Sequence, residues 1–152
     1  MKFVFITLFP ELIAGAASVS ILGRAQKEGL IEVLCVNPRD YATDRHGAGM
    51  VLRVDTYLAA LEKARCLAPD ALVAALTPVG ETLCQARVTA LSRAGRDLIF
   101  LCGHYEGFDE RILEEADLRL SVGDFVMTGG ELPALSVWTR SLVSCQAFWE
   151  NW

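Results

Sequence analysis

Two glycine-rich segments carry the residue types with the clearest chemistry, and both lie in the last third of the chain. The first runs over residues 102–111 and the second over residues 121–133. Glycine lets the main chain approach a ligand closely, so such segments can read a flat heterocycle through backbone N–H and C=O groups. Val122, Phe125 and Met127 would supply apolar walls. The alternative is that these glycines only form tight turns.

The two segments also hold the candidate acid–base groups. Neither segment has the glycine order of a Rossmann dinucleotide site or of a P-loop. Glu106, Asp109 and Glu110 could exchange protons. Asp109 could equally cap a helix and Glu110 could be solvated, while both alternatives stay open for Glu106. His46 and His104 lie far apart in the sequence and no cysteines have C-x-x-C spacing, so no metal site is predicted.

Strand-like and helix-like stretches alternate around these segments. Apolar runs predict strands at 3–8, 31–36, 71–76, 97–102 and 118–122. Helices are expected from Pro10, over 21–27, over 55–67 with Asp55 as its cap, and over 81–94, 109–115 and 131–148. Strands that are apolar throughout are covered on both faces, which indicates an α/β protein with a parallel sheet. Ligands of such sheets bind beyond the carboxyl ends of the strands, so the expected ligand loops are 77–80, 103–108 and 123–130.

The composition is typical of one ordinary domain. The 152 residues are 53% hydrophobic and 22% charged, which excludes a disordered chain. No apolar run reaches the roughly 18 residues that span a bilayer, and Pro10 and Glu11 favour a first strand over a signal peptide. The net charge of −5 requires a local patch for any nucleic acid. Most of the five cysteines lie in apolar runs, which predicts buried free thiols in a reducing cytoplasm.

Four strings of residues carry a family resemblance, and they follow one another over nearly the whole chain. They are residues 8–11, residues 38–40 with 44–46, residues 102–111 and residues 121–134. On these strings the sequence resembles the bacterial tRNA (guanine-N1)-methyltransferases. The resemblance implies one SPOUT-type domain over residues 1–152, with a mostly parallel sheet flanked by helices and a trefoil knot near the C-terminus. It also implies a homodimer that transfers a methyl group from S-adenosylmethionine to N1 of the guanosine 3′ to the anticodon of tRNA.

The resemblance assigns a cofactor site residue by residue. The matching positions are Thr77, Pro78, Gly103, Val122, Gly123, Asp124, Phe125, Val126, Met127, Gly129, Gly130 and Pro133. It places Glu106 near the target guanine, and magnesium is a further cofactor to consider. The reaction must remove the N1 proton, which a carboxylate base and a cation near the guanine oxygen would assist. Glu106 and Arg140 are the catalytic candidates.

The sequence departs from the family pattern in three places. The loop from Asp44 to Met50 is short, so much of the family's surface for guanine or tRNA is expected to be missing. Val143 stands where the family has its catalytic arginine, and Arg140 lies one turn earlier, about 4.5 Å along a helix. The family's catalytic aspartate and its tRNA-binding helical domain lie beyond Trp152, so both are expected to be absent.

Three functions therefore stay open: a truncated and impaired tRNA guanine-N1 methyltransferase domain, a non-catalytic S-adenosylmethionine-binding homodimer, and a SPOUT methyltransferase for another RNA. We expect methylation by this chain to be at least about two orders of magnitude slower than in the family. An apolar stripe on the last helix, made of Leu132, Leu135, Trp138 and Leu142, predicts a two-fold dimer.

Overall fold

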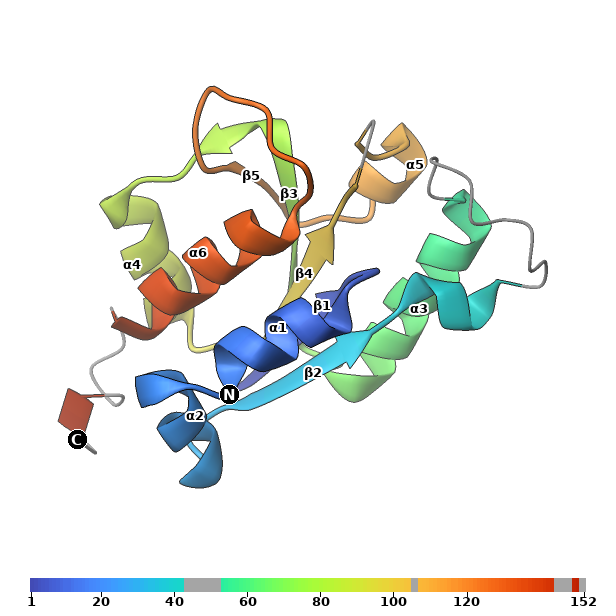
Figure 1. Cartoon of the computed structure of the whole chain (residues 1–152). Coiled ribbons are helices and arrows are strands. Elements are labelled where there is room, and N and C mark those ends of the chain that lie inside the picture. Colours follow the sequence, from blue (N-terminus) through green and yellow to red (C-terminus); the bar gives the residue numbers. More distant parts are fainter. Residues whose placement is uncertain (43–52, 105–106, 144–148, 151–152) are drawn as a thin grey trace.

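A computed structural model describes residues 1–42, 53–104, 107–143 and 149–150 of the chain. Within these residues five strands form one sheet, in which every pairing is parallel. The spatial order is β2-β1-β4-β3-β5 (Figure 1). The strands are β1 (Lys2–Ile6), β2 (Glu32–Val36), β3 (Leu72–Thr82), β4 (Leu98–Cys102) and β5 (Leu118–Ser121). The predicted α/β class with a parallel sheet is confirmed.

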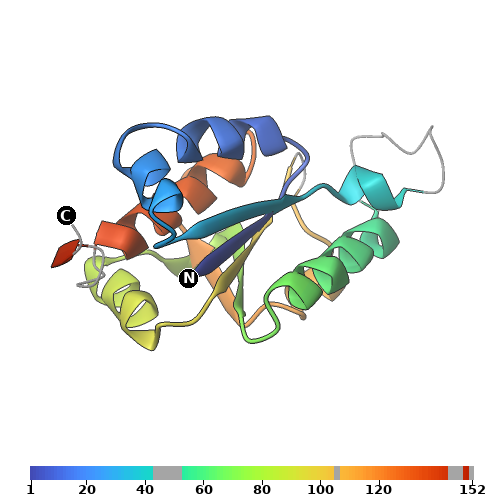
Figure 2. The ribbon, with the colours of Figure 1, turned by 90° about the horizontal axis from the view of Figure 1, so that it is seen from below.

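Helices cover both faces of this sheet. They are α1 (Pro10–Ala17), α2 (Ser20–Lys27), α3 (Val54–Leu67), α4 (Gln85–Ala94), α5 (Glu110–Leu113) and α6 (Glu131–Val143), with a short 3₁₀ turn η1 (Pro38–Tyr41). Buried side chains of α1, α2, α4 and α6 form one core cluster with the strands, and those of α3 and α5 form a second. Figure 2 shows α3 on the opposite side of the sheet from α1 and α6.

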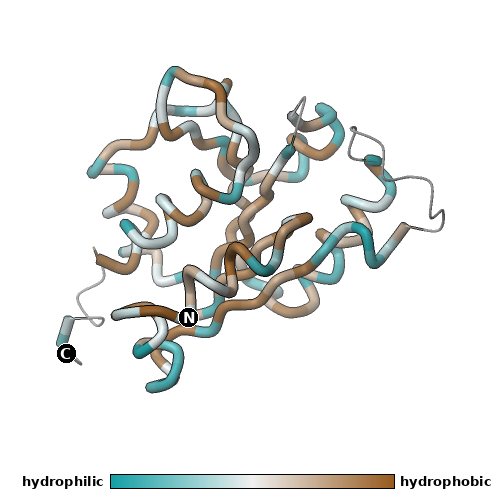
Figure 3. The backbone as a smooth tube through the Cα atoms, in the orientation of Figure 1, coloured by the Kyte–Doolittle hydropathy of each residue, from teal (hydrophilic) through white to brown (hydrophobic). Residues whose placement is uncertain are grey.

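The central strands are buried on both faces, which explains why their sequences do not alternate. All five residues of β4 are buried, as are four of the five in β1. Figure 3 shows hydrophobic residues along the strands in the middle of the molecule, while hydrophilic residues gather at turns and helix ends. In an open parallel sheet, a ligand binds in the space beyond the carboxyl ends of the strands. Among the described residues, no helix has the length and apolarity that a bilayer crossing needs.

Three predicted boundaries were wrong. The helix expected over 81–94 begins only at Gln85, because Glu81 and Thr82 still belong to β3 and pair with β5. The loop expected at 77–80 is likewise part of β3, which continues through a register shift between Leu76 and Glu81. The helix expected from Asp55 begins at Val54, with Arg53 in the cap position. The carboxylate of Asp55 pairs with the Arg53 guanidinium at 3.0 Å instead of capping.

Two predictions about burial were also wrong. Trp138 and Leu142 of the apolar stripe on α6 lie in the core, where Trp138 packs edge-on against Phe3 and Phe5. The stripe therefore exposes only part of its apolar surface, with Leu132 51% exposed. Of the free cysteines among the described residues, Cys102 is buried, whereas Cys35, Cys66 and Cys84 are exposed.

Candidate functional site

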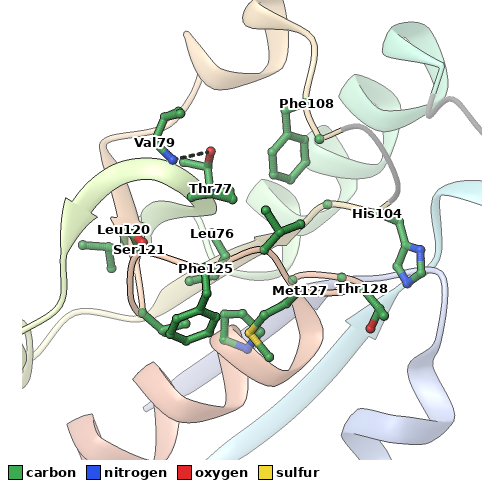
Figure 4. Close-up of a pocket in the computed structure, with 18 of the residues that line it drawn as sticks. Leu76, Thr77, Val79, His104, Phe108, Leu120, Ser121, Phe125, Met127 and Thr128 are labelled. Atoms are coloured by element: carbon green, nitrogen blue, oxygen red, sulfur yellow. Dashed lines mark hydrogen bonds between the residues drawn. The ribbon is translucent and has the colours of Figure 1, made fainter.

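One cavity of about 490 Å³ lies beyond the carboxyl ends of β4 and β5 and beside the middle of β3. Its wall is built from residues 76–79, from the segment after β4, from residues 120–130 and from Pro133 in the first turn of α6 (Figure 4). That volume lies within the range of pockets that enclose cofactor-sized ligands. The cavity therefore occupies the position that a parallel sheet favours for binding.

The structure brings eleven of the twelve predicted cofactor positions to this cavity. They are Thr77, Pro78, Gly103, Val122, Gly123, Phe125, Val126, Met127, Gly129, Gly130 and Pro133. Asp124 is the exception, because its side chain is exposed and does not line the cavity. Their role in binding stays a prediction, but their convergence from four separate segments is a property of the fold.

Ten further residues line the cavity that were not among the predicted cofactor positions. They are Leu76, Val79, His104, Gly107, Phe108, Glu110, Leu113, Leu120, Ser121 and Thr128. His104, Gly107 and Phe108 could have been predicted, because residues 103–108 were an expected ligand loop. Leu76, Leu113 and Leu120 gave no such signal, because an apolar residue at the end of a strand or helix looks the same in a core as in a pocket.

The extended end of β3 forms one wall because two chain segments approach very closely there. A Cβ atom on Gly80 would lie 2.6 Å from the carbonyl carbon of Arg119. Only glycine allows that approach, which keeps β3 paired with β5 beyond the register shift. The next turn is fixed by Ser121, whose hydroxyl donates to the Gly123 carbonyl at 2.9 Å and accepts from the Gly123 N–H at 3.3 Å.

The floor of the cavity joins the two glycine-rich segments through their backbones. The Gly130 N–H donates to the Gly103 carbonyl at 2.8 Å, and His104 and Gly129 form an isolated antiparallel bridge. A Cβ atom on Gly130 would lie 2.9 Å from both the Cys102 Cα and the Gly103 nitrogen. Gly130 is therefore required by the packing of one segment on the other.

A buried polar cluster lies next to this floor. Glu131 is 3% exposed, and its Oε1 accepts a hydrogen bond from the Thr7 hydroxyl at 2.8 Å. The hydroxyl of Thr7 in turn accepts from the Phe9 N–H at 2.9 Å. The other carboxylate oxygen, Oε2, lies 3.8 Å from Nε2 of His104. The imidazole ring of His104 also packs on Phe9, with ring centroids 4.9 Å apart.

The end of β4 is held from the other face of the sheet by Tyr57 of α3. Its hydroxyl lies 3.3 Å from the Cys102 carbonyl and 3.4 Å from the Ile6 carbonyl, and it donates to them. Burial raises the pKa of Tyr57 well above its usual value, with smaller contributions from Cys102 and Glu131. The phenol therefore stays protonated and remains a donor to the strand ends.

The acidic candidates take different places. Asp109 caps α5, as the capping alternative predicted, by accepting from the Arg111 N–H at 2.9 Å. Hydrogen bonds from Arg111 lower the pKa of Asp109 to about 2. Glu110 lines the cavity and pairs with Arg119 at 3.1 Å. Glu106 lies outside the described residues.

Arg140 does not reach the cavity in this structure. Its guanidinium is exposed and donates to Oε1 of Gln85 in α4 at 2.5 Å. It lies seven residues beyond Pro133, the α6 residue that lines the cavity, and α6 rises about 1.5 Å per residue. Its catalytic role stays a prediction, with no contact to the lining residues behind it. No group of three His, Cys, Asp or Glu side chains suited to a metal ion occurs within the described ranges, and magnesium also stays a prediction.

The sequence matches the family model described as tRNA (Guanine-1)-methyltransferase TrmD over residues 1–143. The chain belongs to this family. A tRNA (guanine-N(1)-)-methyltransferase of Synechococcus sp. (strain JA-3-3Ab) is 45% identical over 148 residues, covering 90% of this chain and 58% of the relative. The enzyme of the same name from Myxococcus xanthus (strain DK1622) is 42% identical over 142 residues, covering 87% of this chain and 58% of the relative.

The fold of the family is also present in a solved structure. The crystal structure of tRNA (m1G37) methyltransferase from Aquifex aeolicus superposes with a TM-score of 0.80 at 31% identity. The superposition covers 93% of this chain and 68% of that one. The chain spans less than two thirds of the length of the sequence relatives named above.

Proposed function

We propose that this chain is the cofactor-binding and methyl-transfer domain of a tRNA guanine-N1 methyltransferase. In this proposal it takes S-adenosylmethionine as methyl donor and the guanosine 3′ to the anticodon as acceptor, in the cytoplasm where tRNA is found. The observation that carries the proposal is the convergence of eleven of the twelve assigned positions on one cavity. Family membership over residues 1–143 supports the reaction class.

The lining residues suit the adenosyl part of this cofactor. A flat base needs apolar side chains on its faces and backbone groups at its edge. Leu76, Leu120 and Phe125 offer the faces, and the glycine-rich chain at 122–130 offers the edge. When bound, the cofactor supplies an electrophilic methyl group, and the chain's own task is to hold and orient it while excluding water.

The chemical step is expected to be slow in this chain. Arg140 is bonded to Gln85 and does not line the cavity. A donor that stabilises developing charge typically raises the rate about 10²–10³-fold. The displacement of Arg140 from the cavity alone would therefore lower the rate by about two orders of magnitude. Glu106 is the carboxylate that we propose as the base.

A homodimer is part of the proposal. Leu12 of α1 is 43% exposed, and Leu132 and Val143 of α6 are 51% and 49% exposed. The last two residues lie eleven apart, which is about three helical turns, so they share one face of α6. Helices α1 and α6 contact each other (Figure 1), and a second copy covering this surface would remove it from water.

The proposal also includes the trefoil knot. After β5 at the sheet edge, the chain returns past the strand ends, where the Gly130 N–H bonds to the Gly103 carbonyl. Helix α6 then packs against β4. In the proposed knot, the segment that leads into α6 passes through a loop formed by the preceding part of the chain.

Calorimetric titration with S-adenosylmethionine, together with tritiated methyl transfer to unmodified tRNA, tests the proposal. We expect saturable binding, and transfer that is slow but specific for the guanosine 3′ to the anticodon. Gly123→Val should weaken binding strongly, because its side chain would enter the cavity wall and displace the Phe125 ring. Gly15→Val is the matched control, since Gly15 has open space around it.

Failure of the wild-type protein to bind the cofactor would refute the proposal. Equal affinity in the wild type and Gly123→Val would refute the site assignment. Binding without any transfer would favour the non-catalytic module.

A further inference from the structure

The buried carboxylate of Glu131 connects three parts of the molecule that are far apart in the sequence. Glu131 opens α6, Thr7 follows β1, and His104 follows β4. Thr7 donates to Oε1 at 2.8 Å, and Nε2 of His104 lies 3.8 Å from Oε2. The Thr7 hydrogen bond and the nearby imidazole offset part of the cost of burying this carboxylate, so Glu131 and His104 are held as one unit.

The imidazole of His104 has little freedom in this arrangement. Its side chain is 15% exposed and lies between the Phe9 ring and the Glu131 carboxylate. Gly129 closes the remaining side, because a Cβ there would lie 2.6 Å from Nε2 of His104 and 2.5 Å from Oε2 of Glu131. Packing against Phe9, Gly129 and Glu131 therefore restricts the position of the ring.

That position is at one end of the cavity. Figure 4 shows His104 and Thr128 at one end, whereas Leu120 and Phe125 lie at the other. A ligand that fits both ends must itself be divided, with a flat, weakly polar part and a strongly polar part. S-adenosylmethionine is divided in this way, since its base lies at one end and its amino-acid group, with an ammonium and a carboxylate, at the other.

We propose that Glu131 is a positioning residue, which acts through His104 on the amino-acid end of the bound cofactor. This inference rests on the proposed function, because it assumes that the cavity takes an adenosyl cofactor. Glu131 holds the imidazole at the polar end of the cavity, and His104 contacts the amino-acid group there. Glu131 itself does not line the cavity, so its effect on the ligand must pass through His104.

Two ligands separate this role from a merely structural one. S-adenosylhomocysteine carries the amino-acid group, whereas 5′-methylthioadenosine has the same adenosyl part without it. Glu131→Gln keeps the shape and an acceptor for Thr7 but removes the charge. We expect Glu131→Gln and His104→Asn each to weaken S-adenosylhomocysteine roughly tenfold in calorimetric titration, the size of a lost charged hydrogen bond, and to leave methylthioadenosine within about twofold.

The double variant should weaken S-adenosylhomocysteine no further than either single variant, because both changes act on one contact. Glu114→Gln, which neutralises an exposed carboxylate at the end of α5, is the matched control and should change neither affinity. Parallel loss of both ligands would show a structural role and overturn the inference. Additive losses would show that Glu131 does not act through His104. If the wild type binds neither ligand, the proposed function itself fails.

Discussion

The floor and the rim of the cavity are built in opposite ways. The floor joins residues 102–104 to residues 129–131 through a 2.8 Å backbone hydrogen bond, a bridge and the buried Glu131. The rim, in contrast, exposes large apolar side chains. Val126 is 88% exposed, Val79 is 83% exposed and Phe125 is 55% exposed. The same loop, 122–130, supplies residues to both regions.

This difference shows that a residue can lie in a binding site either because the packing of the protein requires it or because the ligand does. In the floor, Gly130 and Glu131 are fixed by other parts of the protein whether or not a ligand is present. At the rim, Phe125 and Val126 leave apolar surface in water, which favours a ligand or a partner that covers it. Substitutions that disturb the packing of the floor should therefore act mainly on folding, whereas substitutions at the rim should act mainly on binding.

The largest effect is expected from Gly130→Val. The new Cβ would lie 2.9 Å from backbone atoms of Cys102 and Gly103, which cannot move without disturbing β4. We expect the free energy of unfolding to fall by about 2–3 kcal/mol, the cost of overpacking a closed site. Urea denaturation measures this loss. Gly15→Val, on the exposed side of α1, should change it by less than about 0.5 kcal/mol.

Thr7→Val should give the next largest effect. The isosteric change removes the hydroxyl that donates to the buried Glu131 carboxylate at 2.8 Å. Leaving a buried acceptor without that donor should lower the free energy of unfolding by about 2 kcal/mol. Thr139→Val serves as control, because the Thr139 hydroxyl donates to a helix carbonyl at a partly exposed position. An equal loss in both variants would contradict the special role of the floor.

Phe125→Ala should produce the opposite pattern, with a change in binding rather than in stability. Its ring is 55% exposed and forms a wall of the cavity. We expect S-adenosylhomocysteine to bind roughly tenfold more weakly, while the urea midpoint stays close to that of the wild type. Val19→Ala, at an equally exposed apolar residue away from the cavity, should change neither quantity. A large loss of stability in Phe125→Ala would remove the distinction between floor and rim.

The smallest effect concerns pH and the exposed cap of α5 beside the cavity. Arg111 lowers the pKa of Asp109 from 3.8 to about 2 in the folded protein. Because the folded value lies below the unfolded one, ionised Asp109 stabilises the native state above about pH 4, and this contribution is lost as the pH falls toward 2. The difference in Tm between the wild type and Asp109→Asn should shrink over that interval. A difference in Tm that stays constant from pH 5 to pH 2 would contradict the stabilising role of ionised Asp109.

Local patterns in the sequence were enough to predict the strands at 31–36 and 97–102, the start of α1 at Pro10 and the cap at Asp109. Each depends on residues within a few positions of one another, and the covering of a parallel sheet on both faces makes its strands apolar throughout. The glycine-rich segments likewise predicted where a cavity would form. Eleven of the twelve positions assigned from the family resemblance lie around it.

The tertiary structure decided the features that depend on contacts between distant residues. Glu81 and Thr82 continue β3 because Leu120 and Ser121 lie beside them, which no local helix pattern could show. Trp138 is buried because Phe3 and Phe5 receive it.

The hydrogen bond from Thr7 to Glu131 spans 124 residues, and neither local sequence predicts it. Burial and pairing of this kind are properties of the closed fold, because they exist only after the sheet has brought the strand ends together.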